Sequence, residues 1–189
     1  MPIKRINYLI KSFIEKPAGS IILSYMGIIF TGALFLMPPY ANSDGNWLSF
    51  INALFTSTSA ICVTGLIVVD TATAFTPIGQ IIILILIQTG GLGIMIISYF
   101  GTYLMRRETS LKDKMTIQFL LDEQDTAKIS KTIINIFAIT ILFELIGAVL
   151  LYTKFSANFG HTPRAILFSV FHSISAFCNA GFALFSDSM

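Results

Sequence analysis

The sequence has 189 residues, of which 54% are hydrophobic and only 12% are charged, and its mean hydropathy is +0.78. Soluble globular proteins contain about 45–50% apolar and about 25% charged residues, so this composition excludes an ordinary soluble domain and indicates an integral membrane protein. The net charge of +2 is too small and too dispersed along the chain to favour nucleic-acid binding.

The N-terminal region places four basic residues before the first apolar segment, residues 19–38. These are Lys4, Arg5, Lys11 and Lys16. The segment has about the 20 residues that a helix needs to cross a bilayer. It is too long for a signal peptide and lacks a small-residue cleavage site. We therefore expect a retained span at about 19–38, with the N-terminus in the cytoplasm.

The next apolar segment, residues 47–69, predicts a different element. If it crossed the membrane, the basic N-terminus and the charged stretch at 106–131 would lie on opposite sides, against the positive-inside rule. A re-entrant element, with a pore helix at about 47–60 and a turn at 61–66, removes this conflict. Non-helical backbone at membrane depth is tolerated where it is buried in protein or lines a water-filled cavity. The turn therefore predicts a pore lining.

The rest of the chain repeats this order. The expected elements are a second span at about 77–105, a cytoplasmic loop at 105–131, a third span at 132–152, a second pore helix at 163–176 and a second turn at 177–182. The predicted fold is thus all-α and integral to the membrane, with one complete span–pore-loop–span unit (1–104) and one partial unit (132–189). Because four such loops surround an ion in a filter of this kind, we expect the chain to be the N-terminal portion of a longer protein.

A duplicated motif carries the two predicted turns. Residues 55–66 and 171–182 align at an offset of 116 and share six identities, namely Phe55/Phe171, Ser57/Ser173, Ser59/Ser175, Ala60/Ala176, Cys62/Cys178 and Gly65/Gly181. The two cysteines occupy matching positions, so duplication and not a disulfide framework explains them. No metal-ligand cluster accompanies the motif.

The chemistry of the turns follows from what a potassium filter requires. Such a filter replaces the water shell of the ion with backbone carbonyl oxygens, and glycine permits the tight turn because it adopts positive φ at little cost. The candidate carbonyl donors are Cys62, Val63, Thr64 and Gly65 in the first turn, and Cys178, Asn179, Ala180 and Gly181 in the second. An alternative is that both are ordinary helix ends with a glycine after the last turn.

Other polar residues have two interpretations each. Asp70 would either concentrate cations at the outer mouth or be a solvated loop residue. Glu144, inside the third span, is a functional candidate or a carboxylate hydrogen-bonded within its own unit. Residues 88–94, Gln-Thr-Gly-Gly-Leu-Gly-Ile, favour helix packing or a bend over phosphate binding. His172 is interpreted as structural.

At these residues the chain strongly resembles the Trk/Ktr/HKT superfamily of potassium transporters, especially the bacterial Ktr and Trk membrane subunits. The motifs that carry the resemblance are 56–66, 88–94, 143–147 and 175–182. The resemblance implies four span–pore–span units, with Gly65 and Gly181 as the first two filter glycines. It also implies a homodimer gated by a cytosolic ring of nucleotide-binding subunits, for which residues 106–131 would be a docking surface. The short N-terminus is similar to the Ktr branch, which implies Na⁺ as a coupling ion.

The sequence therefore predicts a multi-pass plasma-membrane protein that conducts K⁺ between the carbonyls of its two turns. It predicts no enzyme activity, no cofactor besides the transported ions, and no partner besides lipid, a second copy and the regulatory ring. The alternative is a membrane structural or assembly protein, or a non-functional fragment, whose duplicated loops only pack.

Overall fold

The structure is a computed structural model that describes residues 17–93, 96–97 and 126–185. Its elements are α2 (Pro17–Leu36), the 3-10 helix η1 (Pro39–Ala41), α3 (Phe50–Ile61), α4 (Thr71–Ala74), α5 (Pro77–Leu92), α8 (Thr126–Phe159) and α9 (Pro163–Phe177). Within these ranges there is no strand, and Asn42 and Phe75 form an isolated antiparallel bridge. The all-helical architecture is consistent with a membrane transporter and agrees with the predicted class at that level.

The end of α2 is determined by prolines and by one asparagine. α2 ends at Leu36, two residues before the predicted end of the span, because Pro38 and Pro39 follow and cannot continue a helix. The buried Asn42 side chain points its Nδ2 at the carbonyls left open at this end. The carbonyl oxygens belong to Leu36 (3.1 Å), Met37 (3.1 Å) and Pro38 (2.8 Å). One side chain thus closes the helix and fixes the connection that leads to α3.

Side-chain caps determine where α3 and α9 begin. Ser49 Oγ accepts a hydrogen bond from Asn52 N at 3.3 Å, so α3 begins at Phe50 and not at the predicted residue 47. Thr162 Oγ1 accepts from Ala165 N at 3.3 Å, and Pro163 occupies the first helical position, where its missing N–H removes no bond.

The predicted second and third spans correspond to helices of different lengths. α5 ends at Leu92, where Gly93 takes a φ of +84°. Apart from 93 and 96–97, the remainder of the predicted span to 105 and the predicted loop as far as residue 125 lie outside the described residues. α8 extends beyond the predicted range of 132–152 at both ends.

One helix in the described part of the chain is long and apolar enough, by length and composition, to cross a membrane. It is Lys131–Ala157, within α8. The other predicted spans contain the shorter apolar helices Ile21–Leu36 and Pro77–Leu92.

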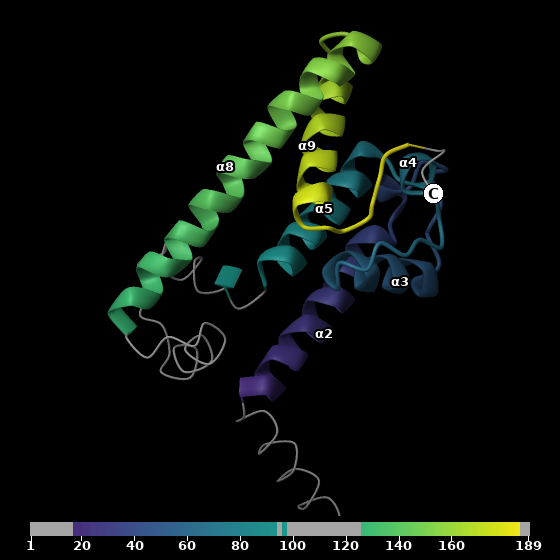
Figure 1. The fold of residues 1–189 in the computed structure, drawn as a ribbon. Helices are drawn as coiled ribbons and strands as arrows, with labels where there is room; N and C mark the ends of the chain where they lie inside the picture. The colour runs from purple at the N-terminus through teal and green to yellow at the C-terminus, as the bar shows by residue number, and fades with distance from the viewer. Residues whose placement is uncertain (1–16, 94–95, 98–125, 186–189) are drawn as a thin grey trace, which may run out of the picture. The chain divides into compact units, whose positions relative to one another are not determined.

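The described residues belong to two compact units. In the first, which includes 96–97 and 126–137, Ile129 and Ile133 are buried against Ile96 and Phe137. The second comprises Ile28–Leu92 and 138–185 and contains every candidate site residue. There, α5 packs against both α3 and α9. Residues 138–159 of α8 and α9 form a helical hairpin, after which the chain reverses direction in the yellow segment of Figure 1.

Candidate functional site

The helices α3 and α9 end in turns that have the same hydrogen bonds. The backbone pairs, donor nitrogen first, are Val63–Ala60 (3.3 Å) and Thr64–Ser59 (3.0 Å) after α3, and Asn179–Ala176 (3.0 Å) and Ala180–Ser175 (2.7 Å) after α9. This is the Schellman arrangement, in which two successive N–H groups satisfy carbonyls of the last helical turn. Both turns therefore begin at a helix C-terminus, whose partial negative charge favours a cation.

The left-handed residue that ends each helix is not the motif glycine. Val63 and Asn179 have φ of +55° and occupy the Schellman position, and Gly65 and Gly181 follow two residues later with φ of +72°. The helices would therefore end in this way without the glycines. The positive φ at Gly65 and Gly181 needs another explanation.

That explanation is the close approach of the two turns to each other. A Cβ on Gly65 would lie 2.7 Å from the carbonyl oxygen of Ala180 and 3.0 Å from the Cα of Gly181. A Cβ on Gly181 would lie 3.1 Å from the Cα of Gly65. The duplicated motifs thus meet at their glycines. A side chain at either position would have both a strained φ and no space.

A serine in each motif connects its helix to the preceding long helix. Ser57 Oγ donates to the Ile29 carbonyl at 2.8 Å, and Ser173 Oγ donates to the Glu144 carbonyl at 2.6 Å. A glycine faces each serine, because a Cβ on Gly32 would be 2.5 Å from Ser57 Oγ and one on Gly147 would collide with Ser173 Oγ. The corresponding residues of the two long helices, Ile29 and Glu144, are therefore 115 positions apart, whereas those of the two motifs are 116 positions apart.

The segment that follows the second turn is held to α9 by two side chains. Ser175 Oγ donates to the Phe182 carbonyl at 2.7 Å, and His172 Nε2 accepts from Leu184 N at 3.1 Å. Because Nε2 accepts, Nδ1 carries the proton and donates to the Phe168 carbonyl at 2.7 Å. His172 therefore fixes the path of the chain beyond the turn, a role that its place on an apolar helix did not specify. In the first motif, Thr64 Oγ1 donates to Ser59 Oγ at 3.0 Å.

Asp70 caps the short helix α4. Its Oδ1 accepts a hydrogen bond from Ala72 N at 2.8 Å. The carboxylate thus has a local structural function. Its predicted place at an outer mouth remains a prediction.

Glu144 is buried and has two kinds of partner. Its main-chain carbonyl accepts from Ser173, and its carboxylate lies beside the side chain of Gln88 on α5. One carboxylate oxygen, Oε1, has no hydrogen-bond partner among the described residues. The surroundings of Glu144 therefore include both predicted units, because Gln88 belongs to the first and Ser173 to the second.

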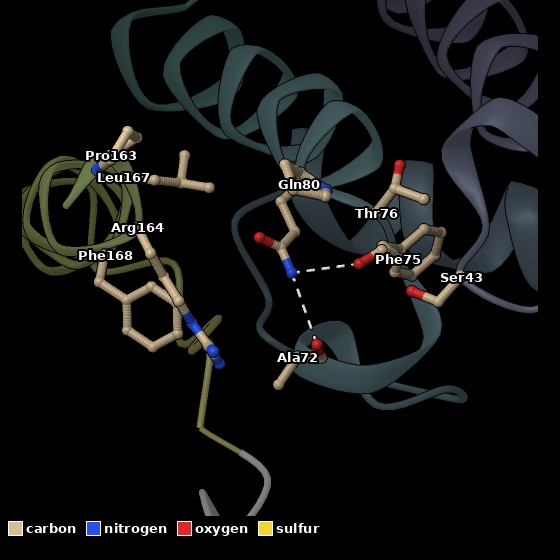
Figure 2. Close-up of a pocket in the computed structure, with 10 residues that line it drawn as sticks. Ser43, Ala72, Phe75, Thr76, Gln80, Pro163, Arg164, Leu167 and Phe168 are labelled. Carbon is tan, nitrogen blue, oxygen red and sulfur yellow. Dashed lines mark hydrogen bonds between the residues drawn. The ribbon is translucent and has the colours of Figure 1, made fainter. Parts of the chain in front are cut away.

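A cavity of about 570 Å³ lies apart from the two turns (Figure 2). One side carries Phe75, Thr76 and Gln80, and the other carries Arg164 and Phe168. The Gln80 carboxamide is directed at backbone carbonyls, including that of Phe75 at 3.2 Å. None of the eight candidate carbonyl donors lines this cavity.

Comparison with known proteins identifies the family. Residues 14–189 match the TrkH family model, described as cation transport protein. The chain is 38% identical over 162 residues to the potassium/sodium uptake protein NtpJ of Enterococcus hirae, covering 86% of this chain and 36% of that protein. It is 40% identical over 169 residues to the Ktr system potassium uptake protein B of Vibrio alginolyticus, covering 89% of this chain and 36% of the relative.

The protein of the same name from Bacillus subtilis is 37% identical over 173 residues, which is 92% of this chain and 38% of the relative. The chain thus spans little more than a third of the length of these relatives. The matches confirm the resemblance to the bacterial Ktr and Trk membrane subunits. This chain belongs to the TrkH family of cation transport proteins.

Proposed function

We propose that this chain forms part of the pore of a potassium-uptake system, in which K⁺ passes between backbone carbonyls of two selectivity-filter turns. The proposed ligands are the carbonyl oxygens of residues 62–65 and 178–181. The protein supplies no covalent chemistry in this proposal, and K⁺ is the substrate. The names of the relatives, which describe potassium or potassium/sodium uptake, support the choice of ion.

One observation carries the proposal. Two segments far apart in the sequence have the same helix-end hydrogen bonds and the same φ angles, and they meet at Gly65 and Gly181. Adjacent turns related in this way are what a ring of equivalent pore loops around one axis requires. The structural alternative, in which the loops only pack, does not require the matched glycines to approach each other.

The remaining architecture follows from the same proposal. α3 and α9 are pore helices, the two motifs belong to successive span–pore-loop–span units, and residues 105–131 form a cytoplasmic loop. We infer a multi-pass protein of the plasma membrane with a cytoplasmic N-terminus. Because the relatives are more than twice as long, we also propose four such units around the ion, two of which this chain supplies in whole or in part.

The partners of the proposed system are inferred from the family. They are the lipid bilayer, a second copy of the transporter and a cytosolic nucleotide-binding ring that docks on the 105–131 loop. Na⁺ is the proposed coupling ion, and the name of the Enterococcus hirae relative includes sodium beside potassium. Asp70 is proposed to increase the cation concentration at the outer mouth while it caps α4.

Growth rescue tests the proposed function. The chain, expressed from its complete gene in a bacterium that lacks potassium uptake, is expected to restore growth at limiting K⁺, and to do so better when Na⁺ is present. Expression in the membrane is verified by immunoblotting, and an empty vector is the control. A well-expressed protein that never restores growth would favour the assembly-protein or fragment interpretation.

A further inference from the structure

One segment of α5 lies against both proposed filter turns. A Cβ on Gly90 would collide with the carbonyl oxygen of Ile61, the last residue of α3 and the neighbour of the first candidate carbonyl donor, Cys62. A Cβ on Gly91 would lie 2.5 Å from Sγ and 2.9 Å from Cβ of Cys178, the first candidate carbonyl donor of the second turn. Two adjacent glycines on one helix thus contact the starts of both turns.

A polar residue one helical turn earlier extends this contact to α8. The Gln88 side chain lies beside the Glu144 carboxylate, and the Cys178 thiol is 4.0 Å from Gln88 Oε1, at the limit for a sulfur donor. The Glu144 carbonyl in turn accepts from Ser173 on α9. Gln88 therefore joins α5 to the end of α9 in two ways. The contact with Cys178 is direct, and the contact through Glu144 and Ser173 is indirect.

Glu144 has no polar counterpart in the first repeat. The residue whose carbonyl accepts from Ser57 is Ile29, which occupies the position that Glu144 has in the second repeat. A carboxylate inside a membrane helix is costly and is retained where it has a function. Here the side chain beside it is that of Gln88, which lies in the predicted closing span of the first unit. The polar pair thus connects two units rather than stabilising one.

We propose that residues 88–91 of α5 are a positioning segment that sets the distance between the two filter turns and thereby the preference for K⁺ over Na⁺. The segment acts through Ile61, Cys178 and Glu144 and does not itself contact the ion. This inference rests on the proposed function of the turns as a filter.

A double-mutant cycle between Gly91 and Cys178 tests the inference. Gly91→Ala introduces a methyl group against the Cys178 side chain and is expected to reduce the ratio of K⁺ to Na⁺ uptake by about tenfold. Cys178→Gly removes both atoms that the methyl group meets. In the Cys178→Gly background, Gly91→Ala is therefore expected to change the ratio by less than about twofold, because coupled sites deviate from additivity.

Two further variants serve as matched controls. Gly90→Ala meets a backbone carbonyl that no side-chain change can remove, so Cys178→Gly is not expected to relieve its effect. Gly27→Ala, on α2, would meet nothing within 4 Å and is expected to retain the parental ratio. All uptake is measured with the protein from its complete gene, in vesicles with matched amounts of folded protein.

The polar pair provides a second test should the alanine variants not fold. Glu144→Gln keeps a hydrogen-bonding side chain toward Gln88 and is expected to retain at least half of the parental ratio. Glu144→Leu and Gln88→Leu are each expected to reduce it severalfold. If the ratio of K⁺ to Na⁺ uptake were the same in all three variants, the inference would be overturned.

The outcomes separate this inference from the function on which it rests. A parental protein without selective K⁺ uptake overturns the proposed function and the inference together. Selective uptake that Gly91→Ala leaves unchanged, or an effect of the same size in both Cys178 backgrounds, overturns the inference alone.

Discussion

Val63 and Asn179 occupy equivalent left-handed positions with very different side chains. Both have φ of +55° at the residue that ends a pore helix in our proposal. Asparagine tolerates this conformation, whereas a β-branched residue is strained in it, at a cost of about 1–2 kcal/mol. Strained backbone of this kind is concentrated at functional sites. The first turn therefore stores strain that the second does not.

Exchanging these two side chains should have opposite effects on stability. Val63→Asn is expected to increase the free energy of unfolding by about 1 kcal/mol, and Asn179→Val to decrease it by about the same amount, because only the fit to the left-handed region changes. Thermal unfolding of the detergent-solubilised protein measures both. Shifts of the same sign would show that packing at these positions outweighs backbone strain.

The contrast at these positions shows what residue types could and could not reveal. The duplicated glycines predicted tight turns, and Gly65 and Gly181 do have positive φ. Each turn also has a left-handed residue before its glycine. At Val63 this conformation was not predictable, because the β-branched side chain disfavours it. Asn179 was the available signal. The reason for the glycines, the contact between the turns, depends on tertiary structure that no local pattern encodes.

At the scale of elements, each proposed pore helix is joined to a long helix by a buried serine hydrogen bond. The bonds of Ser57 to Ile29 and of Ser173 to Glu144 join corresponding elements of the two repeats, and a glycine makes room for each serine. Because the serine donor and its carbonyl acceptor recur in both repeats, the same helix packing is stabilised in each of them. These bonds therefore determine how each turn is placed relative to its preceding helix.

Removing either serine hydroxyl should destabilise the protein by a similar amount. Ser57→Ala and Ser173→Ala are each expected to lower the free energy of unfolding by about 1 kcal/mol, the usual net value of a buried hydrogen bond. Ser156→Ala is the control, since the Ser156 hydroxyl donates to the Thr153 carbonyl within α8 in a bond that is exposed to solvent. If the control variant were as unstable as the other two, the loss would not come from the serine–span bonds.

Element boundaries followed the capping residues more closely than the apolar composition. α3 begins after Ser49 and α2 ends before the prolines, although the apolar segments extend further in both cases. Both signals are present in the sequence as local chemistry. The contacts of Gly90 and Gly91 with the two turns were not predictable, because small residues indicate close helix packing without identifying the partner.

At the scale of the whole molecule, the chain belongs to a family of cation transport proteins and spans little more than a third of the relatives to which it was compared. The compact unit formed by Ile28–Leu92 and 138–185 brings two equivalent turns into contact. In our proposal, these turns are neighbouring parts of one filter. In that proposal α5 has two functions, since it belongs to the second span and also carries the positioning segment between the turns.

The most direct test of this account is the ratio of K⁺ to Na⁺ uptake by vesicles that contain the protein from its complete gene, with Gly65→Ser and Gly181→Ser as variants and Gly27→Ala as the control. A serine at either turn must adopt positive φ at about 1–2 kcal/mol and lacks space beside the other turn. Since 1.4 kcal/mol corresponds to a tenfold change, each variant is expected to lower the ratio by about tenfold, with the control unchanged. Parental ratios in both serine variants would contradict the account and remove the two glycines from the filter.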